Sequence, residues 1–202
     1  MNDSILIVFV KNPRLGKVKT RLAKTIGQEK ALKIYHKLLK HTEATISQLS
    51  CDIALYFSDG IENDAPWNKS HYKKNIQSGK DLGERMQSAF RDQFQNHYNQ
   101  VVIIGSDLWD LNPTILEEAF NELSSHDVVV GPAKDGGYYL LGLNDMQPAL
   151  FKNKSWSTPE VLEQTLLDLQ NQNVKLLNTL NDIDTFEDLK SHPKLLNELE
   201  SL

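Results

Sequence analysis

The sequence predicts an α/β fold with a mostly parallel central sheet covered by helices on both faces. Short apolar runs of strand length alternate with segments of helical periodicity along the chain. The runs are apolar throughout, as in Ile5–Val10, which is typical of strands buried on both faces. With 202 residues the chain is long enough for one well-packed domain, so we expect a single domain over residues 1–202.

The first half of the chain alternates in this way. Gln28–Leu49 carries an apolar stripe at helical spacing and predicts a long helix. Ile53–Phe57 is the second apolar run of strand length, and the polar stretch Glu62–Gly79 is expected to be a loop. Apolar residues at steps of four predict a helix from Leu82 to Phe94, and Val101–Ile104 is the third strand.

The second half continues the alternation. A helix is expected to begin at Pro113, because proline suits the first helical turn. The remaining expected elements are, in order, a strand at Val128–Val130, a strand at Tyr138–Leu143, a helix opening at Thr158, a strand at Val174–Leu177 and a helix from Thr185 onward. In parallel sheets, ligands bind beyond the carboxyl ends of the strands, so the loops that follow the strands are the candidate site.

Composition excludes several classes. The formal charge is -5, with 22 basic and 27 acidic residues, which disfavours a nucleic-acid or acidic-membrane binder. Cys51 is the single cysteine, so an internal disulfide and a Cys-rich zinc site are excluded. The first residues lack the positive region of a signal peptide, and no apolar stretch approaches the roughly 20 residues that span a bilayer. We therefore expect a cytoplasmic protein without a membrane span.

Positive charge is concentrated directly after the first strand. The basic residues there are Lys11, Arg14, Lys17, Lys19 and Arg21. Backbone N–H groups at a helix start, together with lysine or a bidentate arginine, hold phosphates well, and Gly16 permits close backbone approach. Neither the P-loop pattern nor G-x-G-x-x-G occurs. The segment predicts a site for the phosphates of a nucleotide; the alternative is a solvated basic loop.

Aspartates follow two other strands. Asp107 ends Gly105-Ser106-Asp107 and suits a hard divalent cation. The alternative is that it belongs to a turn or caps the helix that begins at Pro113. Asp182 and Asp184 alternate, so in extended backbone their carboxylates point the same way and provide a second metal anchor. The alternative is a capping box that begins at Asp184, which would leave one of the two aspartates with a capping role.

A glycine pair marks the loop before the strand Tyr138–Leu143. Gly136 and Gly137 free the backbone for close contact with a ligand, and Asp135 beside them is a candidate general base. The local sequence by itself favours a tight hairpin turn with Asp-Gly chemistry. None of the histidines lies in the candidate loops, and G-x-S-x-G and H-E-x-x-H are absent, so a serine hydrolase or a histidine-ligated metalloenzyme is not expected.

Six motifs, in a fixed order, resemble one bacterial family. They are the segments Lys11–Ala23, Asp81–Met86, Gly105–Asp107, Gly131–Leu143, Trp156–Thr158 and Asp182–Leu189. Together they resemble the glycosyltransferase-like family known as radical-SAM/selenodomain-associated transferases, over about Ile5 to Leu189. This family is similar to the nucleotide-diphospho-sugar transferase superfamily and to molybdenum-cofactor and phospholactate guanylyltransferases. The resemblance implies a Rossmann-like fold of the glycosyltransferase A type.

The resemblance also implies roles for residues. Those implied to line the nucleotide phosphates are Gly16, Lys17, Lys19, Thr20 and Arg21, to which we add Lys11 from the basic loop. Asp107 would be the metal-binding aspartate for Mg²⁺ or Mn²⁺, completed by Asp184 with Asp182. Those expected to face the transferred sugar or the acceptor are Asp135, Gly136, Gly137 and Trp156.

Aromatic residues add two points. Core packing is the favoured role for Trp67, Tyr72 and Trp156, although each suits stacking on a sugar or base. Trp109 stands where the family usually has proline, two residues after Asp107. Loss of that rigid turn would re-aim Asp107 or fill part of the pocket with an indole.

These residues predict a metal-dependent transferase that uses a nucleoside-diphosphate sugar and an unidentified small-molecule acceptor. Asp135 is the expected general base or acceptor-orienting group. A nucleotidyltransferase acting on a nucleoside triphosphate and a phosphorylated acceptor is the alternative. A non-catalytic nucleotide-binding protein is a third interpretation, which Trp109 motivates. The expected partners are a nucleotide or nucleotide sugar, no nucleic acid, and a second copy of the chain if it forms a homodimer.

Overall fold

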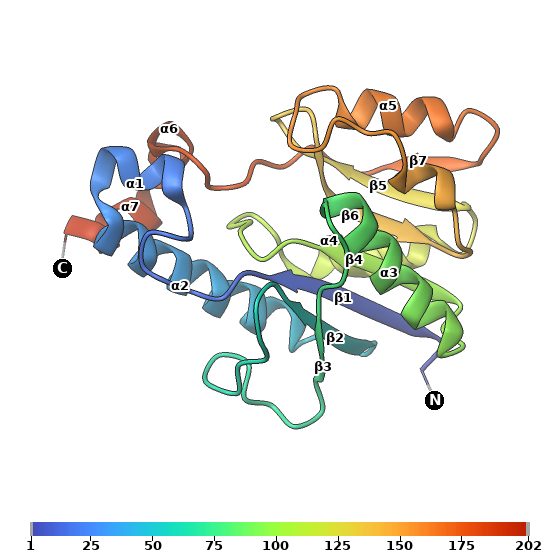
Figure 1. The fold of residues 1–202 in the computed structure, drawn as a ribbon, viewed down its shortest axis with the longest axis horizontal. Coiled ribbons are helices and arrows are strands. Elements are labelled where there is room, and N and C mark those ends of the chain that lie inside the picture. The colour runs from blue at the N-terminus through green and yellow to red at the C-terminus, as the bar shows by residue number, and fades with distance from the viewer. Residues whose placement is uncertain (1, 201–202) are drawn as a thin grey trace.

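The protein is built on one seven-stranded sheet, seen in a computed structural model that describes residues 2–200 (Figure 1). The strands are β1 (Ser4–Val10), β2 (Asp52–Phe57), β3 (Lys73–Ile76), β4 (Gln100–Ile104), β5 (Val128–Pro132), β6 (Tyr138–Leu143) and β7 (Val174–Leu176). Their order across the sheet is β3-β2-β1-β4-β6-β5-β7. Only β6 runs antiparallel to its neighbours, β4 and β5. The prediction of a mostly parallel sheet is therefore confirmed.

Helices cover both faces of the sheet, as predicted. They are α1 (Thr20–Ile26), α2 (Gln28–Ile46), α3 (Leu82–Gln95), α4 (Pro113–Glu122), the 3₁₀-helix η1 (Pro148–Phe151), α5 (Val161–Asp168), α6 (Phe186–Lys190) and α7 (Pro193–Glu200). One buried apolar cluster packs the sheet against α2, α4 and α6, and a second packs it against α3, η1 and α5. No helix within residues 2–200 is long and apolar enough to cross a membrane.

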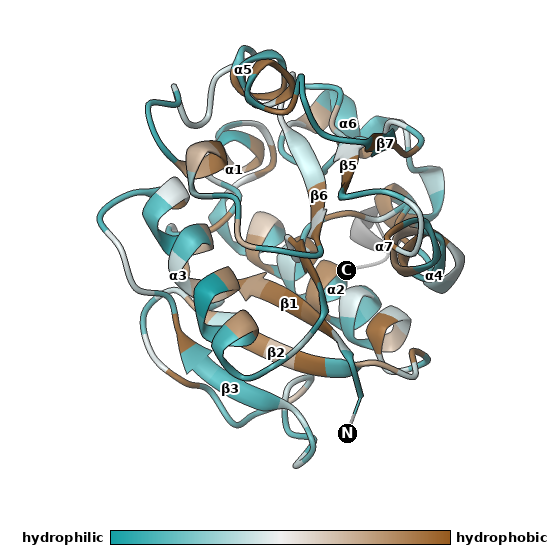
Figure 2. Ribbon diagram, turned by 90° about the vertical axis from the view of Figure 1, so that its right-hand side faces the viewer, coloured by the Kyte–Doolittle hydropathy of each residue, from teal (hydrophilic) through white to brown (hydrophobic). Residues whose placement is uncertain are grey.

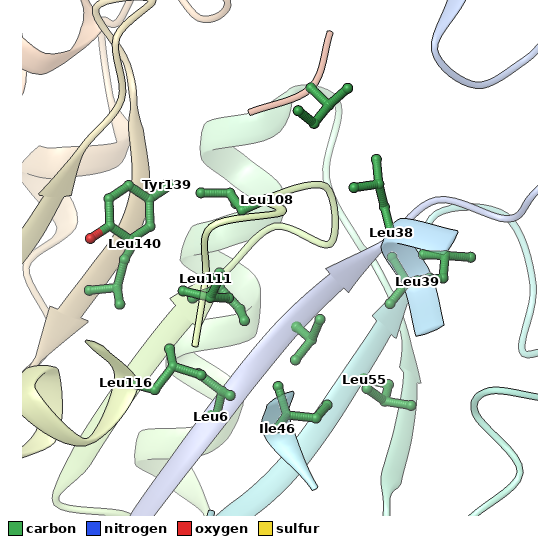
Figure 3. Packing of buried hydrophobic residues seen from close by; sticks show 14 of the residues in the cluster. Leu6, Leu38, Leu39, Ile46, Leu55, Leu108, Leu111, Leu116, Tyr139 and Leu140 are labelled. Atoms are coloured by element: carbon green, nitrogen blue, oxygen red, sulfur yellow. The ribbon is translucent and has the colours of Figure 1, made fainter. Parts of the chain in front are cut away.

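The alternation of side chains along β1 explains why its sequence is apolar without interruption. Leu6 and Val8 belong to one cluster, whereas Ile5 and Ile7 belong to the other. Figure 3 shows Leu6 gathered with leucines of β2 and α2. Burying each such side chain contributes about 1.5–3 kcal/mol relative to leaving it exposed.

Local capping signals set where three helices begin. The side chain of Asp81 accepts a hydrogen bond from the Glu84 N–H at the start of α3. Asn112, not Asp107, caps α4, so the capping interpretation of Asp107 is wrong. Thr185 forms the capping box of α6 with Asp188, and the expected box beginning at Asp184 is displaced by one residue.

The segment predicted to be a loop contains a strand. Within Glu62–Gly79, β3 pairs in parallel with β2 and forms one edge of the sheet. Figure 2 shows β3 as hydrophilic beside the apolar β1 and β2. An edge strand needs neither two buried faces nor apolar side chains, and lysines such as Lys73 and Lys74 are common there. The polar sequence of this segment therefore did not predict the strand β3.

Candidate functional site

A cavity of about 400 Å³ lies beyond the carboxyl ends of β1 and β4. Phe9 and Lys11 reach it from β1 and the loop after it, and Ile104 and Asp107 reach it from β4 and its loop. The turn between β5 and β6 supplies another wall, and residues 182 and 184 supply a further one. The cavity has the position that parallel sheets favour for ligand binding.

The predicted site residues divide into two groups. Those that line the cavity are Lys11, Arg21, Asp107, Asp135, Gly137, Trp156, Asp182 and Asp184. Lys19 adjoins it through an ion pair with Asp107. Four others are absent from the lining: Gly16, Lys17, Thr20 and Gly136. Lys17 and Thr20 are exposed and Gly16 lies against the Gln28 side chain, so their phosphate contacts stay predictions.

Lys19 and Asp107 form an ion pair at the wall of this cavity. The Lys19 Nζ lies 2.8 Å from the Asp107 Oδ2. The lysine side chain is 5% exposed and the aspartate side chain 35% exposed. Burial by itself would raise the pKa of the Asp107 carboxyl, but the charge and hydrogen bond of Lys19 outweigh burial and hold that pKa below its usual value. Asp107 is therefore a stable anion here.

A second pair at the cavity is much more open to solvent. Arg21 Nη1 lies 3.0 Å from Asp184 Oδ2, with the arginine side chain 68% exposed and the aspartate 34% exposed. Water and salt screen such a pair, so it contributes little to stability. Both side chains remain accessible to a ligand that enters the cavity.

The carboxyl group of Asp182 ionises less readily than that of an ordinary aspartate. Burial, followed by the negative charge of Asp107, raises the pKa of this carboxyl to about 6, and the positive charge of Lys19 opposes this rise only in part. The intervening Ile183 is fully buried, and its N–H donates to the Asp107 carbonyl oxygen over 3.2 Å. This contact ties the segment that carries Asp182 and Asp184 to the loop after β4.

The turn between β5 and β6 is a tight hairpin, as the local sequence favoured. The Gly137 N–H donates to the Asp135 Oδ1 over 2.9 Å, which fixes the carboxylate beside the cavity. Gly136 has φ of 88° and lies against Pro159, where an added Cβ would stand 2.2 Å from the Pro159 oxygen. Glycine at 136 thus allows the hairpin to pack against the segment before α5.

The tryptophans occupy different places. Trp67 is buried in the core, as favoured, whereas Trp156 is partly buried, lines the cavity and packs closely over Gly83. Trp109 does not line the cavity; its ring packs at a tilt of 36° against His41 of α2, with 4.7 Å between ring centroids. The expectation that the Trp109 indole fills part of the pocket is therefore wrong, because α2 offers it a partner outside the cavity.

Tyr35 was not predicted as a site residue, yet it joins two site loops. Its buried hydroxyl accepts from the Lys11 N–H over 3.2 Å and donates to the Lys11 carbonyl oxygen over 2.9 Å. The same hydroxyl lies 3.3 Å from the Ser106 Oγ, next to Asp107. Burial raises the pKa of Tyr35 well above its usual value, so it stays protonated. In the sequence it is only one residue of an apolar helical stripe.

The cavity also has an apolar wall that the sequence did not identify. Its members come from β1, β6 and the first turns of α3 and α5: Phe9, Tyr138, Leu82, Met86 and Val161. Spread over four elements, they share no motif. With Trp156 they place apolar surface next to the charged residues, which suits a ligand that has both a ring and phosphates.

The carboxylates suit a cation only in part. Within residues 2–200 no group of three or more His, Cys, Asp and Glu side chains is arranged to hold a metal ion. Asp107 and Asp182 nevertheless line one cavity, where burial and then the negative charge of Asp107 raise the pKa of the Asp182 carboxyl. Oxygen donors of this kind fit Mg²⁺ or Mn²⁺ when a ligand's phosphate oxygens complete the coordination.

A family model described as "Uncharacterized protein conserved in bacteria (DUF2064)" matches residues 41–158 of the 202. The chain belongs to this family. The match includes Asp107 and Asp135, but the basic loop and Asp182 lie outside it. A sequence search of curated proteins finds no match. The narrower resemblance to selenodomain-associated transferases stays a prediction.

Solved structures share the fold. A Desulfovibrio desulfuricans G20 protein, provisionally named a nucleotide-diphospho-sugar transferase, is 29% identical with a TM-score of 0.86, over 98% of this chain and 99% of that one. 4-Diphosphocytidyl-2C-methyl-D-erythritol synthase from Anaerococcus prevotii DSM 20548 is 11% identical with a TM-score of 0.64, over 97% and 96%. Rv0371c from Mycobacterium tuberculosis H37Rv, in complex with manganese, is 14% identical with a TM-score of 0.59, over 96% and 98%. The predicted Rossmann-like fold of the glycosyltransferase A type is confirmed.

Proposed function

We propose that this protein is a metal-dependent transferase that uses a nucleoside-diphosphate sugar as donor. The observation that carries the proposal is one cavity lined by Lys11, Arg21 and Asp107 at the carboxyl ends of the strands. The name of the Desulfovibrio desulfuricans protein, which shares the fold over nearly its whole length, supports the same class of reaction.

The positive charges suit the leaving group of such a reaction. Departure of a nucleoside diphosphate increases negative charge on its terminal phosphate, and cations placed there in advance stabilise that charge. Lys11 and Arg21 line the cavity, and Lys19 lies at its wall on Asp107. Arginine can bind two phosphate oxygens at once, and each lysine acts as a point charge.

A divalent ion, Mg²⁺ or Mn²⁺, would be held by Asp107 and Asp182, with Asp184 as a further ligand. The manganese complex of Rv0371c makes such an ion reasonable for this fold. When bound, the ion would act as a Lewis acid on the diphosphate. Burial and then the negative charge of Asp107 raise the pKa of Asp182, and a cation bound between these carboxylates would oppose both effects.

Asp135 is our proposed general base or acceptor-orienting residue, with Gly137 and Trp156 beside the acceptor. The hydrogen bond from the Gly137 N–H holds one carboxylate oxygen of Asp135, which orients the group at the cavity. A base must reach the proton that it removes, and Asp135 lines the cavity into which the acceptor would enter.

A nucleotidyltransferase is the second candidate. The Anaerococcus prevotii protein, whose name describes a diphosphocytidyl product, shares the fold. In this reaction the same cations would hold a nucleoside triphosphate, and a phosphorylated acceptor would enter beside Asp135. The third interpretation, a non-catalytic nucleotide-binding protein, loses part of its support, because the Trp109 ring packs against His41 and does not fill the cavity.

Calorimetry with UDP- and GDP-sugars, CTP and GTP, each with Mn²⁺, tests the proposal. We expect binding that weakens at least tenfold with chelator or in Asp107→Ala. Binding that neither change affects would overturn the metal role. Product analysis then separates the two reactions, because sugar transfer releases a nucleoside diphosphate and nucleotidyl transfer releases pyrophosphate.

A further inference from the structure

The ammonium of Lys19 contacts the carboxylate of Asp107, which would also hold the proposed metal ion. We propose that Lys19 is a built-in counter-ion of Asp107 that limits metal binding in the absence of nucleotide, and that the nucleotide phosphates draw it away when the metal binds. The inference rests on the proposed function for the identity of the ligands. Its structural basis is the ion pair, in which the Lys19 Nζ lies 2.8 Å from the Asp107 Oδ2 and the lysine side chain is 5% exposed.

The backbone places Lys19 for this contact. It has φ of 48° and ψ of 45°, a left-handed conformation that is unfavourable for a residue with a side chain. Val18 before it and Leu22 after it are buried in the core, so packing on both sides holds the strained residue. The ammonium ends a flexible four-carbon chain, so it can move from one partner to another while its backbone stays fixed.

One lysine serves two carboxylates. Lys19 pairs with Asp107 over 2.8 Å, and Asp182 lines the same cavity as Asp107, so the positive charge of Lys19 acts on both carboxylates. A divalent ion that displaced Lys19 would neutralise both carboxylates but would leave a buried ammonium without a partner. Breaking one half of a buried ion pair is strongly unfavourable, so the metal alone competes poorly for this site.

A nucleotide removes this obstacle. Its phosphate oxygens accept hydrogen bonds from the Lys19 ammonium. They also coordinate the metal ion, for which residues 2–200 offer no group of three or more His, Cys, Asp and Glu side chains. Each ligand then makes the site more favourable for the other, and the coupling is reciprocal. The mechanism therefore links entry of the metal to entry of the nucleotide.

The exchange is tested by titrating Mn²⁺ alone into the full chain, followed by electron paramagnetic resonance of the free ion. We expect Lys19→Met to bind Mn²⁺ at least tenfold more tightly than the wild type, and the gain to disappear in Lys19→Met/Asp107→Asn. Lys154→Met is the matched control, since Lys154 pairs with Asp168 at side-chain exposures of 3% and 35% but lies outside the cavity. Its Mn²⁺ affinity should equal that of the wild type.

Equal Mn²⁺ affinity in Lys19→Met and the wild type would overturn the inference. If Lys19→Met does not fold, Lys19→Gln serves in its place, because an amide can donate to Asp107 without the charge; it should show the same gain. The proposed function fails separately, by absence of nucleotide and nucleotide-sugar binding to the wild type with Mn²⁺, and that result leaves the comparison of lysine variants intact.

Discussion

The two ion pairs at the cavity differ chiefly in burial. Lys19 is almost fully enclosed beside Asp107, whereas Arg21 in its direct pair with Asp184 is largely exposed to solvent. Nearly equal distances therefore give different energies, since water screens the exposed pair and the buried lysine depends on its partner. In the proposed mechanism the nucleotide displaces Lys19 from Asp107, whereas Arg21 is accessible to the nucleotide without such an exchange.

Asp107→Asn should lower the free energy of unfolding by about 1–3 kcal/mol, because it leaves the buried Lys19 without a full counter-ion, although the partial exposure of Asp107 moderates the loss. Asp184→Asn, the control at the exposed pair, should cost at most about 1 kcal/mol. Urea unfolding at pH 7 with chelator measures both. A larger loss in Asp184→Asn would contradict this account.

Asp182 should make stability depend on pH. Its folded-state pKa is about 6, raised first by burial and then by Asp107, against about 3.9 for an unfolded aspartate. Between these values the folded state binds more protons than the unfolded state, so the contribution of Asp182 to stability falls as pH rises from about 4 to about 6.

Asp182→Asn removes this titration. The variant should be about 1–2 kcal/mol more stable than the wild type at pH 7 and nearly equal to it at pH 4. Urea unfolding at the two pH values, with chelator present, measures the difference. A gain of the same size at both pH values would point to packing and not to ionisation.

Among the elements, α2 does more than cover the sheet. Tyr35 on this helix links the loop after β1 to the loop after β4, and so sets the separation of the cationic and acidic sides of the cavity. Trp109 is held by His41 on the same helix. The helix was predictable from its apolar stripe, but its contacts with the loops were not, because they join residues far apart in the chain.

Tyr35→Phe tests this role. Removing the hydroxyl leaves the Lys11 N–H and carbonyl groups without their partner, and we expect about 1–2 kcal/mol lower stability together with weaker nucleotide binding. Tyr98→Phe is the matched control, because the Tyr98 hydroxyl bonds Asp52 at the start of β2, the other end of the sheet. It should lose stability and keep nucleotide affinity; calorimetry and urea unfolding check both.

For the molecule as a whole, we propose a single domain. The two apolar clusters lie on opposite faces of the same strands, so neither can lose its packing without exposing the sheet. Thermal unfolding should therefore show one transition, with the same midpoint by circular dichroism and by tryptophan fluorescence. Two separated midpoints would indicate independent units. Homodimer formation and a cytoplasmic location stay predictions.

The sequence by itself determined the fold class and most of the elements. Continuous apolar runs such as Ile5–Val10 can be buried only between two layers of helix, and that requirement is local enough to be seen in one dimension. The same was true of the Asp135 hairpin, whose turn chemistry lies within a few residues. The sequence did not predict the polar edge strand β3, because only its backbone pairing with β2 identifies it as a strand.

Tertiary structure decided which charged residues meet. Lys17 and Lys19 are two residues apart and were indistinguishable by type, yet Lys17 is exposed while Lys19 is buried against Asp107. Tyr35 and the apolar wall of the cavity likewise acquire their roles only when distant segments pack together. Burial and partner choice depend on the whole fold, so charge patterns in the sequence locate the candidate loops but do not assign the individual contacts.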